Sequence, residues 1–240
     1  MRRIGLIGGT TWTSTALYYR LLNEGAAARL GGLHSADLVL RSVEFADVAA
    51  LQSAGEWAEL GRAYRAEARL LTDAGAEVVG ILANTMHLVY DDVVAGAGVP
   101  VVHVVDEVAA RATELGVSRL GLLGTGYTMS SDLYPRHLEG TGVTTFVPGE
   151  DEAAEVHRII YEELAHDRVL DSSRESLRSI VAGLVDQGAQ GVVLGCTELP
   201  MILSAGDADV PLLDSTALHV DALLDAAGVP QVLTLEEGAA

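Results

Sequence analysis

The sequence predicts an α/β protein made of two similar halves, each with a parallel sheet. Short runs rich in Val, Ile and Leu alternate along the 240 residues with longer segments of helical period. This alternation is typical of buried parallel strands joined by crossover helices. In addition, three motifs of the first half recur in the same order in the second half. Recurrence at a nearly constant offset indicates an internal repeat.

The expected strands are short apolar runs bounded by Gly, Pro or polar residues. They cover residues 3–7, 37–43, 78–82, 101–104, 120–123, 192–194 and 212–213. The expected helices cover residues 13–30, 55–73, 107–115, 153–165, 173–187 and 217–227. Thr10, Thr11 and Thr13 mark the start of the first helix, because a hydroxyl there can accept a hydrogen bond from a free backbone N–H group.

The repeat defines the expected domain boundaries. Its three pairs are 3–8 with 119–124, 75–85 with 188–198, and 99–102 with 210–213. The corresponding offsets are 116, 113 and 111 residues. Buried strands resemble one another in composition, but three ordered matches favour a duplicated unit. We expect residues 1–98 plus 210–240 to form the first domain and residues 99–209 the second.

The repeated motifs also predict where a ligand binds. Open α/β sheets bind ligands beyond the carboxyl ends of their strands, and each motif ends at such a strand. The loops expected to face a shared cleft between the halves are 8–15, 83–87, 125–131 and 196–198.

Composition excludes several classes of partner. The formal charge is −19, with 34 acidic against 15 basic residues, which argues against nucleic acid and anionic membranes because both are polyanions. One cysteine and the lack of paired His spacing argue against a metal site. No apolar run approaches the roughly 18 residues needed to span a bilayer. The apolar segment at residues 4–9 is too short and too glycine-rich for the apolar region of a signal peptide. We therefore expect a cytoplasmic protein with a reduced thiol.

Cys196 is the residue most suited to chemistry. It follows an expected strand and precedes an expected helix, whose N-terminus would lower the pKa of the thiol from about 8.5. Glu198, two residues on, opposes that effect unless it is protonated or relays a proton. A lone buried Cys is often a small hydrophobic residue, but the polar neighbours Gly195, Thr197 and Glu198 favour a function here.

The hydroxyl-rich loops offer backbone N–H groups suited to a carboxylate or a phosphate. Phosphate is the weaker choice, because residues 5–13 lack the Lys of a P-loop and do not fit the GxGxxG pattern. The loops therefore favour a small carboxylate ligand.

Four motifs together resemble the aspartate/glutamate racemase superfamily over essentially the whole chain. They are Gly5-Leu6-Ile7-Gly8-Gly9 followed by Trp12, Ser14, Thr15, Tyr18 and Tyr19; Asn84-Thr85-Met86-His87; Gly124-Thr125 with Tyr127-Thr128-Met129; and Gly195-Cys196-Thr197-Glu198. Residues 29–35, together with Gly55, Glu56 and Trp57, are similar to the broad-specificity amino-acid racemase branch.

This resemblance implies two pseudo-symmetric, flavodoxin-like α/β domains with the active site between them. It implies a homodimer that needs no cofactor and acts on a small amino acid or dicarboxylate by thiol-based proton transfer at the α-carbon. In the family, two cysteines face each other across that carbon. Cys196 would be one base, assisted by Glu198. The candidate substrate-binding residues are Gly9, Thr10, Thr11, Gln52, Asn84, Thr85, Thr125, Tyr127, Thr128 and Thr197.

The sequence departs from the family pattern at Ala83, which both the motif and the repeat place opposite Cys196. A methyl group can neither accept nor donate a proton. Four accounts stay open. Ala83 is a substitution that holds substrate without turnover; or Thr85, His87 or a water carries the second proton; or the enzyme needs one donor only, like the one-cysteine arylmalonate decarboxylases; or the chain only binds its ligand.

His87 distinguishes these accounts. From the first turn of its expected helix it could reach the cleft, with an ordinary pKa of about 6.5 suited to proton transfer. Alternatively, it only caps or packs that helix. Thr10 and Thr13 stand where relatives of this branch carry Met and Glu, which would alter the pocket.

Overall fold

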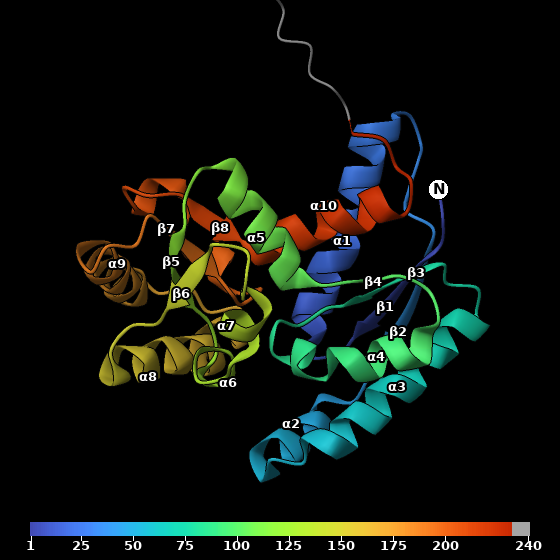
Figure 1. Ribbon diagram of the computed structural model, residues 1–240, viewed down its shortest axis with the longest axis horizontal. Coiled ribbons are helices and arrows are strands. Elements are labelled where there is room, and N and C mark those ends of the chain that lie inside the picture. Colours follow the sequence, from blue (N-terminus) through green and yellow to red (C-terminus); the bar gives the residue numbers. More distant parts are fainter. Residues whose placement is uncertain (232–240) are drawn as a thin grey trace, which may run out of the picture.

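Two four-stranded parallel sheets form the framework of the computed structural model, which describes residues 1–231 (Figure 1). The strand order is β2-β1-β3-β4 in the first sheet and β6-β5-β7-β8 in the second. The strands are β1 (Ile4–Gly8), β2 (Leu38–Ser42), β3 (Val78–Ile81), β4 (Val101–Val102), β5 (Arg119–Leu123), β6 (Thr144–Phe146), β7 (Gly191–Leu194) and β8 (Leu212–Asp214). Because the two orders are equivalent, the predicted α/β fold with two similar parallel sheets is confirmed.

Helices join the strands and cover the sheets. They are α1 (Trp12–Leu30), α2 (Phe45–Ala54), α3 (Trp57–Asp73), α4 (Tyr90–Ala97), α5 (Val104–Glu114), α6 (Gly126–Met129), α7 (Leu133–His137), α8 (Glu150–Arg158), α9 (Asp171–Asp186) and α10 (Ser215–Ala226). Short 3-10 turns are η1 (Thr85–Val89), η3 (Leu164–His166), η4 (Leu199–Met201) and η5 (Ala205–Asp207), and η2 (Ile159–Glu163) is a π-helical turn. None of the helices in residues 1–231 is both long and apolar enough to cross a membrane.

The longest predicted helices are present, but short or irregular elements differ from the prediction. The expected helix 153–165 is divided into α8, the π turn η2 and the 3-10 turn η3. No elements were predicted at α2, α4, α6, α7 and β6. The strand β6 has only three residues, the first of which is exposed, so it lacks the apolar run that marks a buried strand.

The observed strand pairing differs from the expected domain division by one strand at each junction. Val101 of β4 pairs with Val79 of β3, so β4 lies in the first sheet rather than in the second domain. Leu212 of β8 pairs with Val192 of β7, so β8 lies in the second sheet rather than in the first domain. Residues 232–240, the end of the expected first domain, lie outside the described residues.

The helices that follow these two strands pass to the other half. Val105 and Val108 of α5 belong to the core beside Leu120 of the second sheet. Leu223 of α10 belongs to the core beside Ile4 of the first sheet. Figure 1 shows α10 lying between the two sheets, next to α1 and α5. The two halves are therefore held together by exchanged helices.

Candidate active site

A cavity lies between the carboxyl ends of the two sheets, where the repeat predicts the ligand. Both halves of the chain line it. The lining residues are Thr10, Thr11, Phe45, Gln52, Ala83, Asn84, Thr85, Met86, Thr125, Ile160, Tyr161, Ala165, Gly195, Cys196, Thr197 and Glu198. Ala83 and Cys196 occupy equivalent places, each two residues after the last residue of its strand, β3 or β7. The structure thus puts the methyl group and the thiol on the same cavity.

Cys196 forms a close pair with Glu198. The Cys196 Sγ atom donates to Glu198 Oε2 at 2.9 Å, and the Thr197 hydroxyl donates to the same oxygen at 2.6 Å. The Cys196 residue is 9% exposed and Glu198 is 5% exposed. A buried thiol that donates to a buried carboxylate has an acceptor for its proton already in place.

The expected lowering of the thiol pKa is wrong. The segment after Cys196 forms only the three-residue turn η4, not an α-helix, so the chain lacks the aligned peptide dipoles on which that expectation depended. Burial raises the pKa of Cys196 well above its usual value, and the charge of Glu198 and its hydrogen bond raise it further. In the resting protein Cys196 is therefore a thiol and not a thiolate.

Glu198 also connects the two halves. Its second oxygen, Oε1, accepts a hydrogen bond from the Thr11 hydroxyl at 3.1 Å. Thr11 is the N-cap of α1 in the first half, where its hydroxyl also accepts from the Ser14 backbone N–H. The loop after β1 and the loop after β7 therefore meet at one carboxylate.

Three threonine hydroxyls meet on another side of the site. Thr85 Oγ1 lies 2.9 Å from Thr128 Oγ1 and 3.3 Å from Thr125 Oγ1, and the latter two lie 3.3 Å apart. Thr85 and Thr125 line the cavity, whereas Thr128 is buried behind them and does not. Hydroxyl groups at this position can donate to a carboxylate in the cavity.

Asn84 lines the cavity and is held in place through its side chain. Its Nδ2 donates to Ser215 Oγ at 3.0 Å, and its Oδ1 accepts from the Tyr134 hydroxyl at 2.8 Å. Ser215 in turn donates to the Leu194 carbonyl at the end of β7. The side-chain amide of Asn84 thus fixes the loop after β3 against the second half.

Two further candidate binding residues, Gly9 and Tyr127, do not line the cavity. Gly9 has φ of 103°, and a Cβ at this position would collide with the Val43 backbone, so it allows the sharp turn after β1. The ring of Tyr127 packs edge-on against His157. We therefore assign a positioning role to Gly9 and no direct contact with the ligand to Tyr127.

His87 lies outside the cavity, with both ring nitrogens bonded to backbone. Its Nε2 accepts from the Val104 N–H at 3.3 Å, so Nδ1 carries the proton and donates to the Ala83 carbonyl at 3.0 Å. Burial lowers the pKa of His87 to about 4. This geometry corresponds to the packing interpretation, in which His87 holds the backbone of Ala83 from behind.

The apolar part of the cavity was not predicted from the sequence. Its residues are Phe45 at the start of α2, Met86 in η1, Ile160 and Tyr161 in η2, and Ala165 in η3. Burial raises the pKa of Tyr161 to about 12, so its hydroxyl is protonated at neutral pH. A π turn inside a helix often marks a functional site, but the sequence around residue 161 carries no local signal for one.

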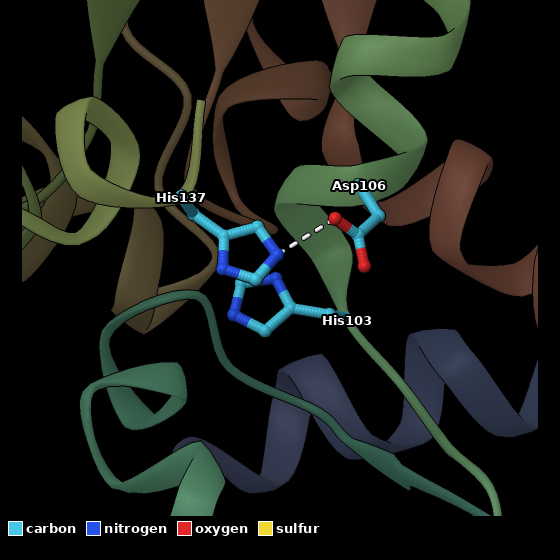
Figure 2. Close-up of side chains that lie close together, drawn as sticks. All are labelled: His103, Asp106 and His137. Atoms are coloured by element: carbon cyan, nitrogen blue, oxygen red, sulfur yellow. Dashed lines mark hydrogen bonds and ion pairs between the residues drawn. The ribbon is translucent and has the colours of Figure 1, made fainter. Parts of the chain in front are cut away.

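A second group of titratable side chains lies away from this cavity (Figure 2). His137 Nε2 lies 2.7 Å from Asp106 Oδ1, and the His137 ring stacks on the His103 ring at 3.6 Å with an interplanar angle of 4°. A histidine binds a metal through a lone pair in its ring plane, and two parallel stacked rings cannot both aim at one ion. The His103 Nδ1 atom already accepts from the Val105 N–H. The cluster therefore fastens α7 to α5.

The fold and the cavity define an α/β protein with a cavity between two similar halves. The family model described as Asp/Glu/Hydantoin racemase matches residues 7–223. The chain belongs to this family.

Solved structures and a curated relative are consistent with this family assignment. A Yersinia pestis protein assigned provisionally to the Asp/Glu racemases is 42% identical, with 95% of this chain and 99% of that chain covered and a TM-score of 0.89. An aspartate racemase homologue from Pyrococcus horikoshii OT3 is 37% identical, with 95% and 100% coverage and a TM-score of 0.84. The broad specificity amino-acid racemase RacX of Bacillus subtilis is 23% identical over 147 residues. That match spans 61% of this chain and 63% of RacX.

Proposed function

We propose that this protein is an amino-acid racemase or epimerase in which Cys196 moves a proton at the substrate's α-carbon. The observation that carries the proposal is the hydrogen bond from the Cys196 thiol to the buried Glu198 carboxylate in a cavity between the two halves. Family membership and the similarity to racemases support the reaction class. The role of each residue is inferred from its geometry.

The resting thiol needs a base, and Glu198 is placed to be that base. Transfer of the thiol proton to Glu198 Oε2 leaves a thiolate, which then takes the α-proton of the substrate. The electron pair of the broken C–H bond stays on the substrate and is shared with its carboxylate. Hydrogen-bond donors aimed at that carboxylate stabilise the charge as it develops, and we assign this role to the hydroxyls of Thr85 and Thr125 together with nearby backbone N–H groups.

Ala83 makes the two faces of the α-carbon unequal. Cys196 can return a proton to the face from which it took one, which exchanges hydrogen and retains configuration. Inversion needs a donor on the other face, which we assign to the side of Ala83, and a methyl group can neither accept nor donate a proton. We assign that delivery to a water or to the Thr85 hydroxyl, so we expect exchange to be faster than inversion.

The sequence also bears on the cofactor. All 15 basic residues are arginine, so these 240 residues contain no lysine. An enzyme that uses pyridoxal phosphate forms a Schiff base with a lysine amine. The composition therefore supports a mechanism in which the protein's own thiol does the proton transfer. A base of this kind requires a reducing compartment, which we take to be the cytoplasm, and the homodimer stays a prediction.

The proposal is tested by following deuterium incorporation at the α-carbon of single amino-acid enantiomers in deuterated water. We expect the natural chain to incorporate deuterium and the Cys196→Ala variant to lose about 10²- to 10⁴-fold of that rate, the usual contribution of a general base. Thr72→Ala, which removes a hydroxyl from α3 and does not touch the cavity lining, is the control. Exchange that survives in Cys196→Ala at the natural rate would exclude the thiol as the base.

The one-cysteine decarboxylase is a second candidate, which Ala83 specifically favours. A decarboxylase needs to protonate one face only, so a single thiol suffices. Release of carbon dioxide from a substituted malonate, without α-hydrogen exchange of any amino acid, would favour it over the racemase.

A further inference from the structure

The walls of the cavity differ in polarity. The donors and acceptors lie on the loops that carry Thr11, Thr85, Thr125 and Glu198. The remaining lining comes from α2, η1, η2 and η3 and is mainly apolar; its residues are Phe45, Gln52, Met86, Ile160, Tyr161 and Ala165. An amino acid whose backbone occupies the polar loops has only the apolar lining left for its side chain.

The charges of the lining residues also favour an uncharged substrate side chain. Among the described lining residues, Glu198 is the one carboxylate, and none is Arg or His. The chain contains no lysine, and residues 232–240 contain no basic residue of any kind. Gln52 is buried, and its amide donates to the Met86 sulfur at 3.1 Å. Tyr161 is protonated and neutral, because burial raises its pKa to about 12.

One cation, Arg20, lies in a neighbouring groove. Arg20 lines a groove that shares Ala165, Thr197 and Glu198 with the cavity, but Arg20 is not part of the cavity lining. Its guanidinium already pairs with Glu24 at 3.3 Å. It is therefore not placed to neutralise an acidic side chain inside the cavity.

From these observations we infer that the substrate is an amino acid with an uncharged, mainly apolar side chain, such as leucine or methionine, and not aspartate or glutamate. This inference rests on the proposed function. A second carboxylate would lose its water against the apolar lining, with no cation to compensate and with Glu198 repelling it. Burial of an unpaired charge is strongly unfavourable, whereas the same lining accepts a hydrocarbon side chain at a gain.

Pairs of amino acids with similar shapes test this inference. Leucine carries methyl groups where aspartate carries carboxylate oxygens, and methionine is similar in length to glutamate. In deuterated water we expect the natural chain to label leucine and methionine with a kcat/KM at least about 100-fold higher than for aspartate and glutamate. Both enantiomers of each are used.

The Gln52→Arg variant adds a cation to the cavity, and Gln52→Met is its uncharged control. We expect Gln52→Arg to shift the ratio towards aspartate and glutamate by about tenfold or more, and Gln52→Met to leave the preference for neutral substrates in place. Faster labelling of aspartate or glutamate by the natural chain would overturn this inference while supporting the proposed function. Labelling of none of the four would overturn both.

Discussion

Glu198 is the single side chain that connects the thiol, a neighbouring hydroxyl and the opposite half. It accepts from Cys196 and Thr197 through one oxygen and from Thr11 through the other. Its charge and its hydrogen bond both raise the pKa of the Cys196 thiol, in addition to the larger effect of burial. Glu198 therefore helps to keep the Cys196 thiol protonated in the resting protein.

Glu198→Gln is expected to lower the pKa of Cys196, because it removes a negative charge beside the thiol. Burial persists in the variant, so the pKa stays above the usual value for a cysteine. The measurement is the pH dependence of alkylation by iodoacetamide, which reports the thiolate. Glu163→Gln is the control, since Glu163 is also buried but bonds to Ser173 and Arg158. An unchanged or raised thiol pKa in Glu198→Gln would contradict this account.

At the scale of elements, loops rather than whole helices hold the site in place. The loop after β3 is fixed through Asn84 to Tyr134 of α7 and to Ser215 at the start of α10. These are contacts between the halves, made by side chains far apart in the sequence. The position of Ala83 and Thr85 in the cavity depends on them.

Tyr134→Phe is expected to destabilise the protein by about 1–3 kcal/mol, because it leaves the buried Asn84 Oδ1 without its donor. Tyr64→Phe is a matched control, since the Tyr64 hydroxyl is equally buried and has no hydrogen-bond partner within residues 1–231. Urea unfolding of both variants measures the difference. Equal loss of stability in the two would show that the Asn84 contact contributes nothing.

The π turn η2 and the short helix α2 show where prediction from sequence fails at this scale. Both supply cavity residues, Tyr161 and Phe45 among them, yet neither belongs to the three repeated motifs. The shape of η2 depends on how α8 meets the core around Ile159 and Ile160, which is a tertiary effect with no local pattern.

At the scale of the whole molecule, buried histidines fill the junction between the halves. His219 on α10 donates through Nε2 to the Val102 carbonyl at 3.2 Å and accepts through Nδ1 from the Tyr18 hydroxyl at 3.0 Å. Burial lowers its pKa to about 3, as it lowers that of His87 to about 4. Both are neutral in the folded protein well below pH 6.5.

Stability should therefore fall as pH falls from about 6.5 to about 4. In this window the unfolded chain protonates both histidines and the folded chain protonates neither, so each contributes a loss of up to about 1.4 kcal/mol per pH unit. His219→Gln, whose amide can replace both hydrogen bonds, should reduce the slope by one histidine's share. Urea unfolding at several pH values measures it. A free energy of unfolding that is constant or rises over this interval would contradict the assignment.

The repeat predicted much of the whole-molecule architecture, because duplicated strands keep their order and their carboxyl ends face one another. It could not assign β4 and β8 to the correct sheet, since the repeat is symmetric and the exchange of α5 and α10 preserves it. The repeat also could not predict whether the Cys196 thiol is protonated. That depends on whether Cys196 precedes a helix or a short turn, which is decided by how residues 199–201 pack. Leu199 in this segment is fully buried.

We propose that Cys196 works on one face of the α-carbon, while Ala83 leaves the other face without a base. The most direct measurement compares exchange and inversion of L-leucine or L-methionine in deuterated water for the natural chain and for Ala83→Cys. We expect the natural chain to exchange faster than it inverts, and Ala83→Cys to raise inversion by about 10²- to 10⁴-fold with little change in exchange. Inversion as fast as exchange in the natural chain, unchanged in Ala83→Cys, would contradict the claim.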